Sequence, residues 1–81
     1  MTRSEILEKI NGVVQDILGN DELNLTETTS PKDVDRWDSI SNINIIMTLE
    51  GEFNIRFGLG ELESMLTVKD IIDGVEHHLG A

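Results

Sequence analysis

The sequence predicts an all-α fold, a small up-and-down bundle of three main helices plus one short helix. Three segments, residues 2–18, 38–53 and 67–79, repeat apolar side chains at the three- and four-residue spacing of an amphipathic helix. The stretches between them are rich in Gly, Asn, Asp, Thr and Ser, residues typical of loops. Because 81 residues seldom hold two independent cores, we expect one domain over residues 1–81.

The first helix is predicted over residues 2–18. Thr2 with Glu5 three residues later is a capping-box signature, and Gly19 supplies an end. The apolar positions that fall on one helix face are Ile6, Leu7, Ile10, Val13, Val14, Ile17 and Leu18. Gly12 lies inside this segment, where glycine costs about 1 kcal/mol relative to alanine, and we interpret it as a point of close packing.

A long loop is predicted over residues 20–37, which are mostly polar and contain the only proline, Pro31. Loops of this length in compact domains are commonly functional. The apolar side chains expected to hold the loop against the core are Leu23, Leu25, Val34 and Trp37.

The second helix is predicted over residues 38–53, with Asp38 as its N-cap and Asn54 as the left-handed residue that ends it. Its core stripe is formed by Ile45, Ile46, Leu49 and Phe53. A second apolar stripe, about 140° away around the helix, is formed by Ile40, Ile43 and Met47. Either the loop over residues 20–37 covers this second stripe, or it is a docking patch flanked by Asn44 and Glu50.

The carboxy-terminal part predicts a turn, a short helix and a long helix. Gly58 and Gly60 mark the turn, and residues 61–65 are expected to form one short helical turn. Thr67 with Asp70 is a second capping-box signature. The apolar residues of the last helix are Val68, Ile71, Ile72, Val75 and Leu79, and Gly80 is its expected stop.

The composition excludes several classes of function. A formal net charge of −10 disfavours nucleic acid and anionic membranes as partners, and favours basic protein surfaces or divalent cations. The absence of cysteine excludes disulfides and a cysteine nucleophile, so any thiol chemistry requires an added group. Because no apolar run approaches the roughly 18 residues of a membrane span and no secretion signal begins the chain, we expect a soluble, cytoplasmic protein. We also expect it to be a monomer.

One serine is placed where a negative group would be stabilised. Ser39 follows the expected N-cap, so it falls in the first turn of the second helix, beside exposed backbone N–H groups and the positive end of the helix dipole. A phosphodiester on its oxygen would be accommodated there. Serine is also common at helix starts, so an ordinary structural role for Ser39 stays open on position alone.

The residues around Ser39 resemble the centre of the acyl carrier proteins. The stretch Asp38-Ser39-Ile40, preceded by Trp37, is similar to that family's Asp-Ser-Leu motif. Residues 49–53, Leu-Glu-Gly-Glu-Phe, resemble the end of the family's motif helix. The order of the predicted helices and loops is similar to that of the family along the whole chain. The similarity includes a final helix that begins with a Thr-Val pair.

The resemblance implies that Ser39 is esterified by a 4′-phosphopantetheine group, which a separate phosphopantetheinyl transferase would donate from coenzyme A. The thiol of this arm would carry acyl chains as thioesters. Catalysis would belong to partner enzymes, so the chain itself is not expected to be an enzyme. By the same resemblance, Asp38 would help to bind the metal ion that accompanies coenzyme A during loading.

The resemblance also implies partners and the positions that they contact. Ile40 and Met47 match positions that touch partners, Glu50 matches an acidic recognition position, and Ile43 belongs to the same patch. The partners would be acyl-transferring or condensing enzymes with basic docking patches, of fatty-acid, polyketide or another specialised acyl pathway. The residues that stand where many fatty-acid carriers have acids are Ser41, Asn44 and Gly51. We therefore expect weaker docking to basic patches along this helix, which favours a specialised pathway.

Other functions stay open at this point. An aminoacyl or D-alanyl carrier would load an amino acid on the same arm, and an unmodified acidic adaptor would dock helices through the second apolar stripe. A dedicated metal site is not predicted, because the acids at Asp33, Asp35 and Asp38 lack the glycine and the distal glutamate of a calcium loop. His77 and His78 are adjacent, so on a helix they face different directions, and we do not predict that they bind a metal ion together.

Overall fold

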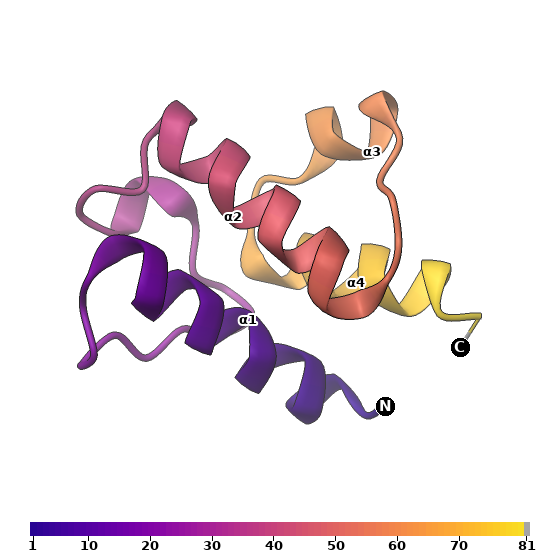
Figure 1. Cartoon of the computed structure of the whole chain (residues 1–81), viewed down its shortest axis with the longest axis horizontal. Coiled ribbons are helices and arrows are strands. Elements are labelled where there is room, and N and C mark those ends of the chain that lie inside the picture. The colour runs from indigo at the N-terminus through magenta and orange to yellow at the C-terminus, as the bar shows by residue number, and fades with distance from the viewer. Residues whose placement is uncertain (81) are drawn as a thin grey trace.

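The computed structural model describes residues 1–80 and is all-helical over that range (Figure 1). Its elements are α1 (Arg3–Leu18), η1 (Pro31–Asp33, a 3-10 turn), α2 (Ser39–Phe53), α3 (Leu59–Ser64) and α4 (Val68–His78). α1 and α2 lie side by side and antiparallel, α4 packs against α1, and the short α3 connects α2 to α4. The prediction of three main helices and one short helix is confirmed.

The core is apolar throughout, and no polar or charged side chain of residues 1–80 is buried. Its members are Ile6, Ile10, Val14, Leu18, Leu25, Trp37, Ile45, Ile46, Leu49, Phe53, Phe57, Val68, Ile71, Ile72 and Val75. These include the predicted core stripe of α2 and two of the four loop anchors, while the other two anchors, Leu23 and Val34, are partly buried. The prediction for Leu79 is wrong: this residue is the C-cap of α4 and is 40% exposed.

The predicted caps set the ends of the long helices. At the start of α1, the Thr2 hydroxyl accepts from the Glu5 N–H at 3.2 Å, and the Glu5 carboxylate accepts from the Thr2 N–H at 2.8 Å. The same reciprocal pair, formed by Thr67 and Asp70, starts α4. The left-handed residues that end α1 and α2 are Gly19, with φ of 66°, and Asn54, with φ of 55°.

The short helix begins earlier than the sequence predicts, at Leu59 instead of residue 61. Glu61 lies inside the first turn, and its carboxylate accepts from the Gly58 N–H at 2.8 Å. The loop before α3 is held in turn by Glu50 of α2, whose Oε2 accepts from the Phe57 N–H at 2.8 Å. These contacts place the start of α3 at the residue after Gly58.

The interpretation of Gly12 as a close-packing point is wrong, because a Cβ at this position would meet no atom within 4 Å. The tightly packed glycine is Gly74 of α4. A Cβ at Gly74 would lie 2.8 Å from the Met65 Cε and 3.0 Å from the Phe57 Cε1. The absence of a side chain at Gly74 therefore makes room for a buried aromatic ring from the loop before α3.

The long loop is bound to two helices through its backbone. Both ends of the Asn11 side-chain amide in α1 hydrogen-bond to the loop. The Val68 and Lys69 N–H groups, at the start of α4, donate to the Thr29 and Glu27 carbonyls, each at 2.9 Å. Because the first N–H groups of a helix have no partner within the helix, the loop satisfies donors that α4 itself leaves open.

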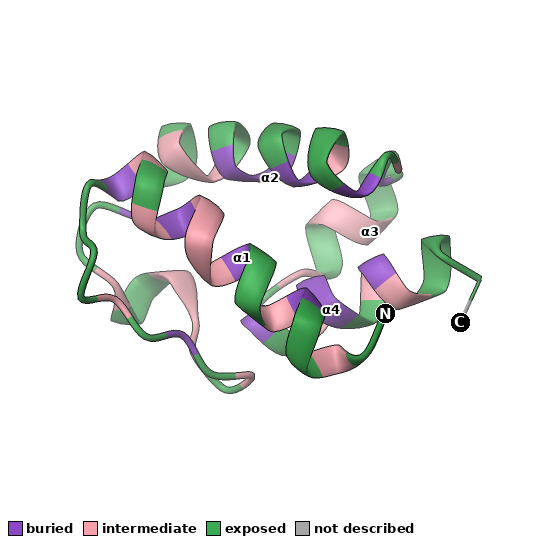
Figure 2. Cartoon of the chain, turned by 60° about the horizontal axis from the view of Figure 1, so that its bottom comes forward, coloured by how far each residue is buried: buried purple, intermediate pink, exposed green. Residues whose placement is uncertain are grey.

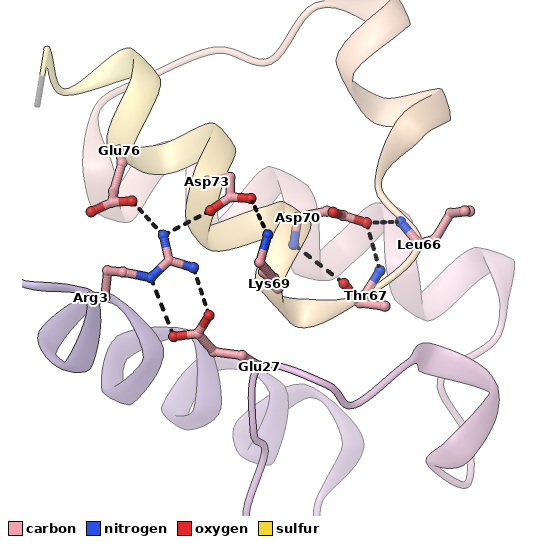
Figure 3. Close-up of polar contacts among 8 residues, drawn as sticks. All are labelled: Arg3, Glu27, Leu66, Thr67, Lys69, Asp70, Asp73 and Glu76. Carbon is pink, nitrogen blue, oxygen red and sulfur yellow. Dashed lines mark hydrogen bonds and ion pairs between the residues drawn. The ribbon is translucent and has the colours of Figure 1, made fainter.

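Arg3 at the start of α1 connects three segments of the chain (Figure 3). Its guanidinium donates to Glu27 of the loop at 2.6 Å and to Asp73 of α4 at 2.7 Å, and it also contacts Glu76. Hydrogen bonds from Arg3 hold the pKa of Glu27 and of Asp73 below the usual values of these carboxyls. Arg3 thus joins the start of α1 to the loop and to α4.

Candidate functional site

Ser39 is the first residue of α2 and its side chain is exposed to solvent. Asp38 is the N-cap in extended conformation, and its carboxylate accepts from the Ser41 N–H at 2.8 Å. This backbone hydrogen bond holds the pKa of Asp38 below its ordinary value. The Ser39 hydroxyl forms no hydrogen bond with any residue in the range 1–80. The predicted position of Ser39, at a helix start and open to solvent, is confirmed.

The residues just before Ser39 fix the direction in which the chain enters α2. Trp37 is buried to 6% exposure, and its indole N–H donates to the Asn42 side-chain oxygen at 2.9 Å. Arg36 adopts a φ of 72°, in the left-handed region that few non-glycine residues occupy. The buried indole and its hydrogen bond therefore anchor the end of the loop to the first turns of α2.

A shallow groove of about 330 Å³ opens beside Ser39. Its lining residues are Pro31, Lys32, Trp37, Asp38, Ser39, Asn42 and Met65. The groove thus combines the start of α2, the 3-10 turn of the loop and the end of α3. A flexible group attached to the Ser39 oxygen could lie along it without displacing core side chains.

The second apolar stripe of α2 is exposed, so the loop does not cover it. Ile40, Ile43 and Met47 are 75%, 59% and 63% exposed. Figure 2 shows the buried stripe of α2 turned toward the rest of the molecule and the exposed side turned away. Beside Ile43 and Met47, between α2 and α3, lies a groove of about 270 Å³ that Leu62 also lines.

Charged side chains are sparse on α2. The helix carries two of the chain's sixteen acids, Glu50 and Glu52, and none of its six bases. Residues 39–49, which include the exposed stripe, carry no charge at all. Glu50 is half-buried, and its hydrogen bond to the Phe57 N–H gives it a structural role that the sequence did not reveal.

The end of α4 contacts α3 through one of the two histidines. The His78 Nε2 lies 2.8 Å from the Glu61 Oε1, and the His78 ring packs edge-on against Phe57 with centroids 5.5 Å apart. Donation from the Gly58 N–H, and secondarily from His78, lowers the pKa of Glu61. Glu61 therefore joins the start of α3 to the end of α4.

Two further properties concern residues 1–80 as a whole. Over this range, none of the helices combines the length and the apolar character that crossing a bilayer requires. Nor do three or more His, Asp or Glu side chains in it gather closely enough to hold a metal ion.

Comparison with known proteins identifies relatives over almost the whole chain. It is 33% identical to the acyl carrier protein of Thermotoga maritima over 98% of both chains, and 35% identical to that of Thermosynechococcus vestitus over the full length of both. The acyl carrier protein of Rubrobacter xylanophilus is 36% identical over 96% of both chains. No family model matches. The chain belongs to the acyl carrier protein family.

The fold agrees with this family. The solution NMR structure of the holo acyl carrier protein from Geobacter metallireducens superposes with a TM-score of 0.86 and 36% sequence identity. The match covers 93% of the present chain and 86% of that protein. The likeness therefore extends to the arrangement of the helices as well as to the sequence.

In this member of the acyl carrier protein family, the structure brings most of the predicted site residues together. Asp38, Ser39 and Ile40 lie at the start of α2, and Ile43 and Met47 continue the exposed side of the same helix. Glu50 lines the groove beside Ile43 and Met47, and its carboxylate also accepts from the Phe57 N–H in the loop before α3. Sequence reasoning missed Lys32, Asn42 and Met65 as residues that line the groove beside Ser39. Lys32 and Met65 come from other elements and no local pattern marks them, whereas Asn42 lies one turn after Ser39 in α2 itself.

Proposed function

We propose that this chain carries acyl intermediates as thioesters on a 4′-phosphopantetheine arm attached to Ser39. The observation that carries the proposal is the Ser39 hydroxyl, exposed and without a hydrogen-bond partner in residues 1–80, at the first position of α2. The arm supplies a thiol, which a chain without cysteine lacks. In this proposal residues 1–81 form a single carrier domain that presents Ser39 to separate enzymes.

The surroundings of Ser39 fit a phosphodiester. The positive end of the α2 dipole lies at this residue, and no acidic side chain occupies the first turn of the helix. The Asp38 carboxylate accepts from the Ser41 N–H at 2.8 Å, so part of its negative charge is offset by a backbone donor. The groove of about 330 Å³ beside Ser39, with Lys32 at its edge, gives an attached arm a surface to lie on.

The attachment is tested by loading. The chain is incubated with coenzyme A, Mg²⁺ and the phosphopantetheinyl transferase of its own organism, and intact mass is then measured. We expect the mass of one prosthetic group to be added to the wild type and nothing to Ser39→Ala. The matched control is Ser41→Ala, in the same turn of α2, which should load like the wild type. A folded wild-type chain that stays unmodified with several transferases would refute the proposal.

Asp38 is proposed to help bind the metal ion used in loading, in addition to its observed role as N-cap. Asparagine caps helices about as well as aspartate, so Asp38→Asn separates the two roles. We expect this variant to keep the thermal stability of the wild type but to load more slowly at low Mg²⁺, with partial recovery at high Mg²⁺. Equal loading rates at every Mg²⁺ concentration would leave Asp38 with the capping role alone.

The cargo is proposed to be an acyl group of a specialised pathway, with fatty-acid and polyketide synthesis as the other acyl pathways. The support is the absence of charge over residues 39–49, where many fatty-acid carriers have acids. Intact mass of the chain purified from its own organism reads the cargo directly. An amino acid on the arm would establish an aminoacyl carrier instead, and partner binding that needs no modification would establish an adaptor.

A further inference from the structure

The pair Asn11-Gly12, in the middle of α1, combines two unusual features. Asn11 is the only asparagine of the chain that a glycine follows. Gly12 lies inside a helix, yet packing does not require a glycine there, because a Cβ would meet no atom within 4 Å. We propose that Asn11 is a site of deamidation, and that the fold of α1 and of the long loop holds this site closed. This proposal does not depend on an arm at Ser39.

The reaction needs only these two residues and water. The backbone nitrogen of Gly12 attacks the side-chain carbonyl carbon of Asn11, and the new C–N bond closes a five-membered imide. The side-chain nitrogen leaves as ammonia and takes up the proton that the backbone nitrogen gives up. Water then opens the imide at one of its two carbonyls, which gives aspartate or isoaspartate. Glycine favours the ring closure, because without a Cβ it lets the reacting groups approach closely and adopts many backbone angles.

In the folded chain both reacting groups are engaged. Residues 11 and 12 lie within α1, where backbone N–H groups belong to the helical hydrogen-bond ladder. The Asn11 Nδ2 donates to the Leu23 carbonyl at 3.2 Å, and the Asn11 Oδ1 accepts from the Leu25 N–H at 2.8 Å. The side-chain amide is thereby held by the loop at both of its ends. Ring closure therefore requires α1 to unwind at Gly12 and the loop to leave Asn11.

Neither product restores the contacts of Asn11. The Leu23 carbonyl, which also accepts from the Gln15 Nε2 at 2.8 Å, would face a charged oxygen of aspartate in place of the Nδ2 donor. Isoaspartate adds a carbon to the main chain, so the hydrogen-bond ladder of α1 loses its register. The contact also holds a core residue, since Leu25 is 3% exposed. Deamidation would therefore be a one-way mark of chains that have opened.

The test compares the folded chain with the same chain unfolded in guanidinium chloride, at the same mildly alkaline pH and temperature. Conversion of each asparagine is read from peptide fragment masses, because an OH group replaces NH2. We expect Asn11 to convert at least about tenfold more slowly in the folded chain, since only opened molecules react. Protection of less than about tenfold would show that the fold does not hold the site closed, and would overturn the proposal.

Asn24 is a control within each sample. It is exposed in the loop, outside any helix, but Leu25 follows it. The Leu25 side chain hinders ring closure, so we expect Asn24 to convert much more slowly than Asn11 in the unfolded chain. Equal rates at the two asparagines in the unfolded chain would remove the special reactivity assigned to Asn11 and overturn the proposal.

Gly12→Ala separates the chemical role of the glycine from its effect on the stability of α1. In guanidinium chloride, where α1 is unfolded, the only difference between this variant and the wild type at the reacting groups is the Cβ. We expect Asn11 to convert at least about tenfold more slowly in Gly12→Ala under this condition. The same rate in both unfolded chains would refute the role of Gly12.

Asn11→Asp reproduces the aspartate product, and Asn24→Asp is the matched control, because it adds the same charge at an exposed loop position. We expect the melting temperature of Asn11→Asp to be lower than that of Asn24→Asp by about 4 °C or more, since a hydrogen bond is replaced by a pair of facing acceptors. Equal melting temperatures would show that the aspartate product fits the folded chain, and would overturn the one-way character of the mark.

Discussion

The two sides of α2 carry similar side chains in opposite surroundings. On one side, Ile45 and Leu49 are fully buried against the other helices, whereas Ile43 and Met47 on the other side are more than half exposed. Burial of apolar area is the main favourable contribution to folding. Stability is therefore assigned to the first side, and the exposed residues of the second, next to Ser39, are available for binding.

The largest expected effect comes from truncating one large apolar side chain on each side of α2 to alanine. Leu49→Ala should lower the free energy of unfolding by about 2–5 kcal/mol, because it removes packed methyl groups and leaves a cavity. Met47→Ala should change it by less than about 0.5 kcal/mol. Urea or thermal unfolding followed by circular dichroism measures both. Similar losses in the two variants would show that the exposed apolar stripe of α2 contributes to the core.

The same contrast between packed and open surroundings separates two glycines within helices. Gly12→Ala should raise the free energy of unfolding by about 0.5–1 kcal/mol, since alanine favours helix and nothing lies within 4 Å of its Cβ. Gly74→Ala gains the same propensity, but its Cβ would press on the buried Phe57 ring, and overpacking costs about 1–3 kcal/mol. We expect Gly74→Ala to be the less stable of the two variants. The opposite order would show that Phe57 and Met65 shift at little cost.

Local signals in the sequence were enough to predict both ends of α1 and α2 and the start of α4. The Thr2–Glu5 and Thr67–Asp70 pairs act over three residues, and the left-handed turn of Asn54 involves only its own backbone, so each is visible in the sequence. The position of Ser39 followed from the N-cap at Asp38 for the same reason. What makes the candidate site recognisable is thus largely local.

Contacts between distant segments could not be predicted in this way. Arg3 meets Asp73, seventy residues away, and nothing in the neighbourhood of either residue indicates the contact. Gly12 was misinterpreted because the sequence shows that a glycine is present but not which atoms lie around it. The hydrogen bond between the Glu50 carboxylate and the Phe57 N–H, seven residues away, was not foreseen either, because the helix position of Glu50 does not reveal how the loop before α3 folds back toward it.

The smallest expected effect concerns the polar contacts at the start of α1, which contrast with the apolar stripes on both sides of α2. Arg3→Met removes the cation that Glu27, Asp73 and Glu76 share. Since these side chains are partly exposed, solvent screens the interaction, and we expect only a modest decrease in melting temperature at pH 7. Lys9→Met is the matched control, because it removes one cation of α1 whose single ion pair within residues 1–80, with Glu52 at 4.0 Å, is loose.

The pH dependence gives the Arg3 contacts a distinct signature. The pKa of Glu27 and of Asp73 is lowered in the folded chain by hydrogen bonds from Arg3. A depressed carboxyl pKa contributes stability above the unfolded-state values of about 4, and this contribution is lost as the pH falls through the folded-state pKa. The difference in melting temperature between wild type and Arg3→Met should therefore be largest near neutral pH and shrink in acid. Acid also lowers the net negative charge of both proteins and so weakens their general charge repulsion. Because this effect is common to wild type and Arg3→Met, it cancels in the difference between their melting temperatures. For Lys9→Met the difference should vary little with pH, and the same flat profile for Arg3→Met would show that the three carboxylates gain nothing from Arg3.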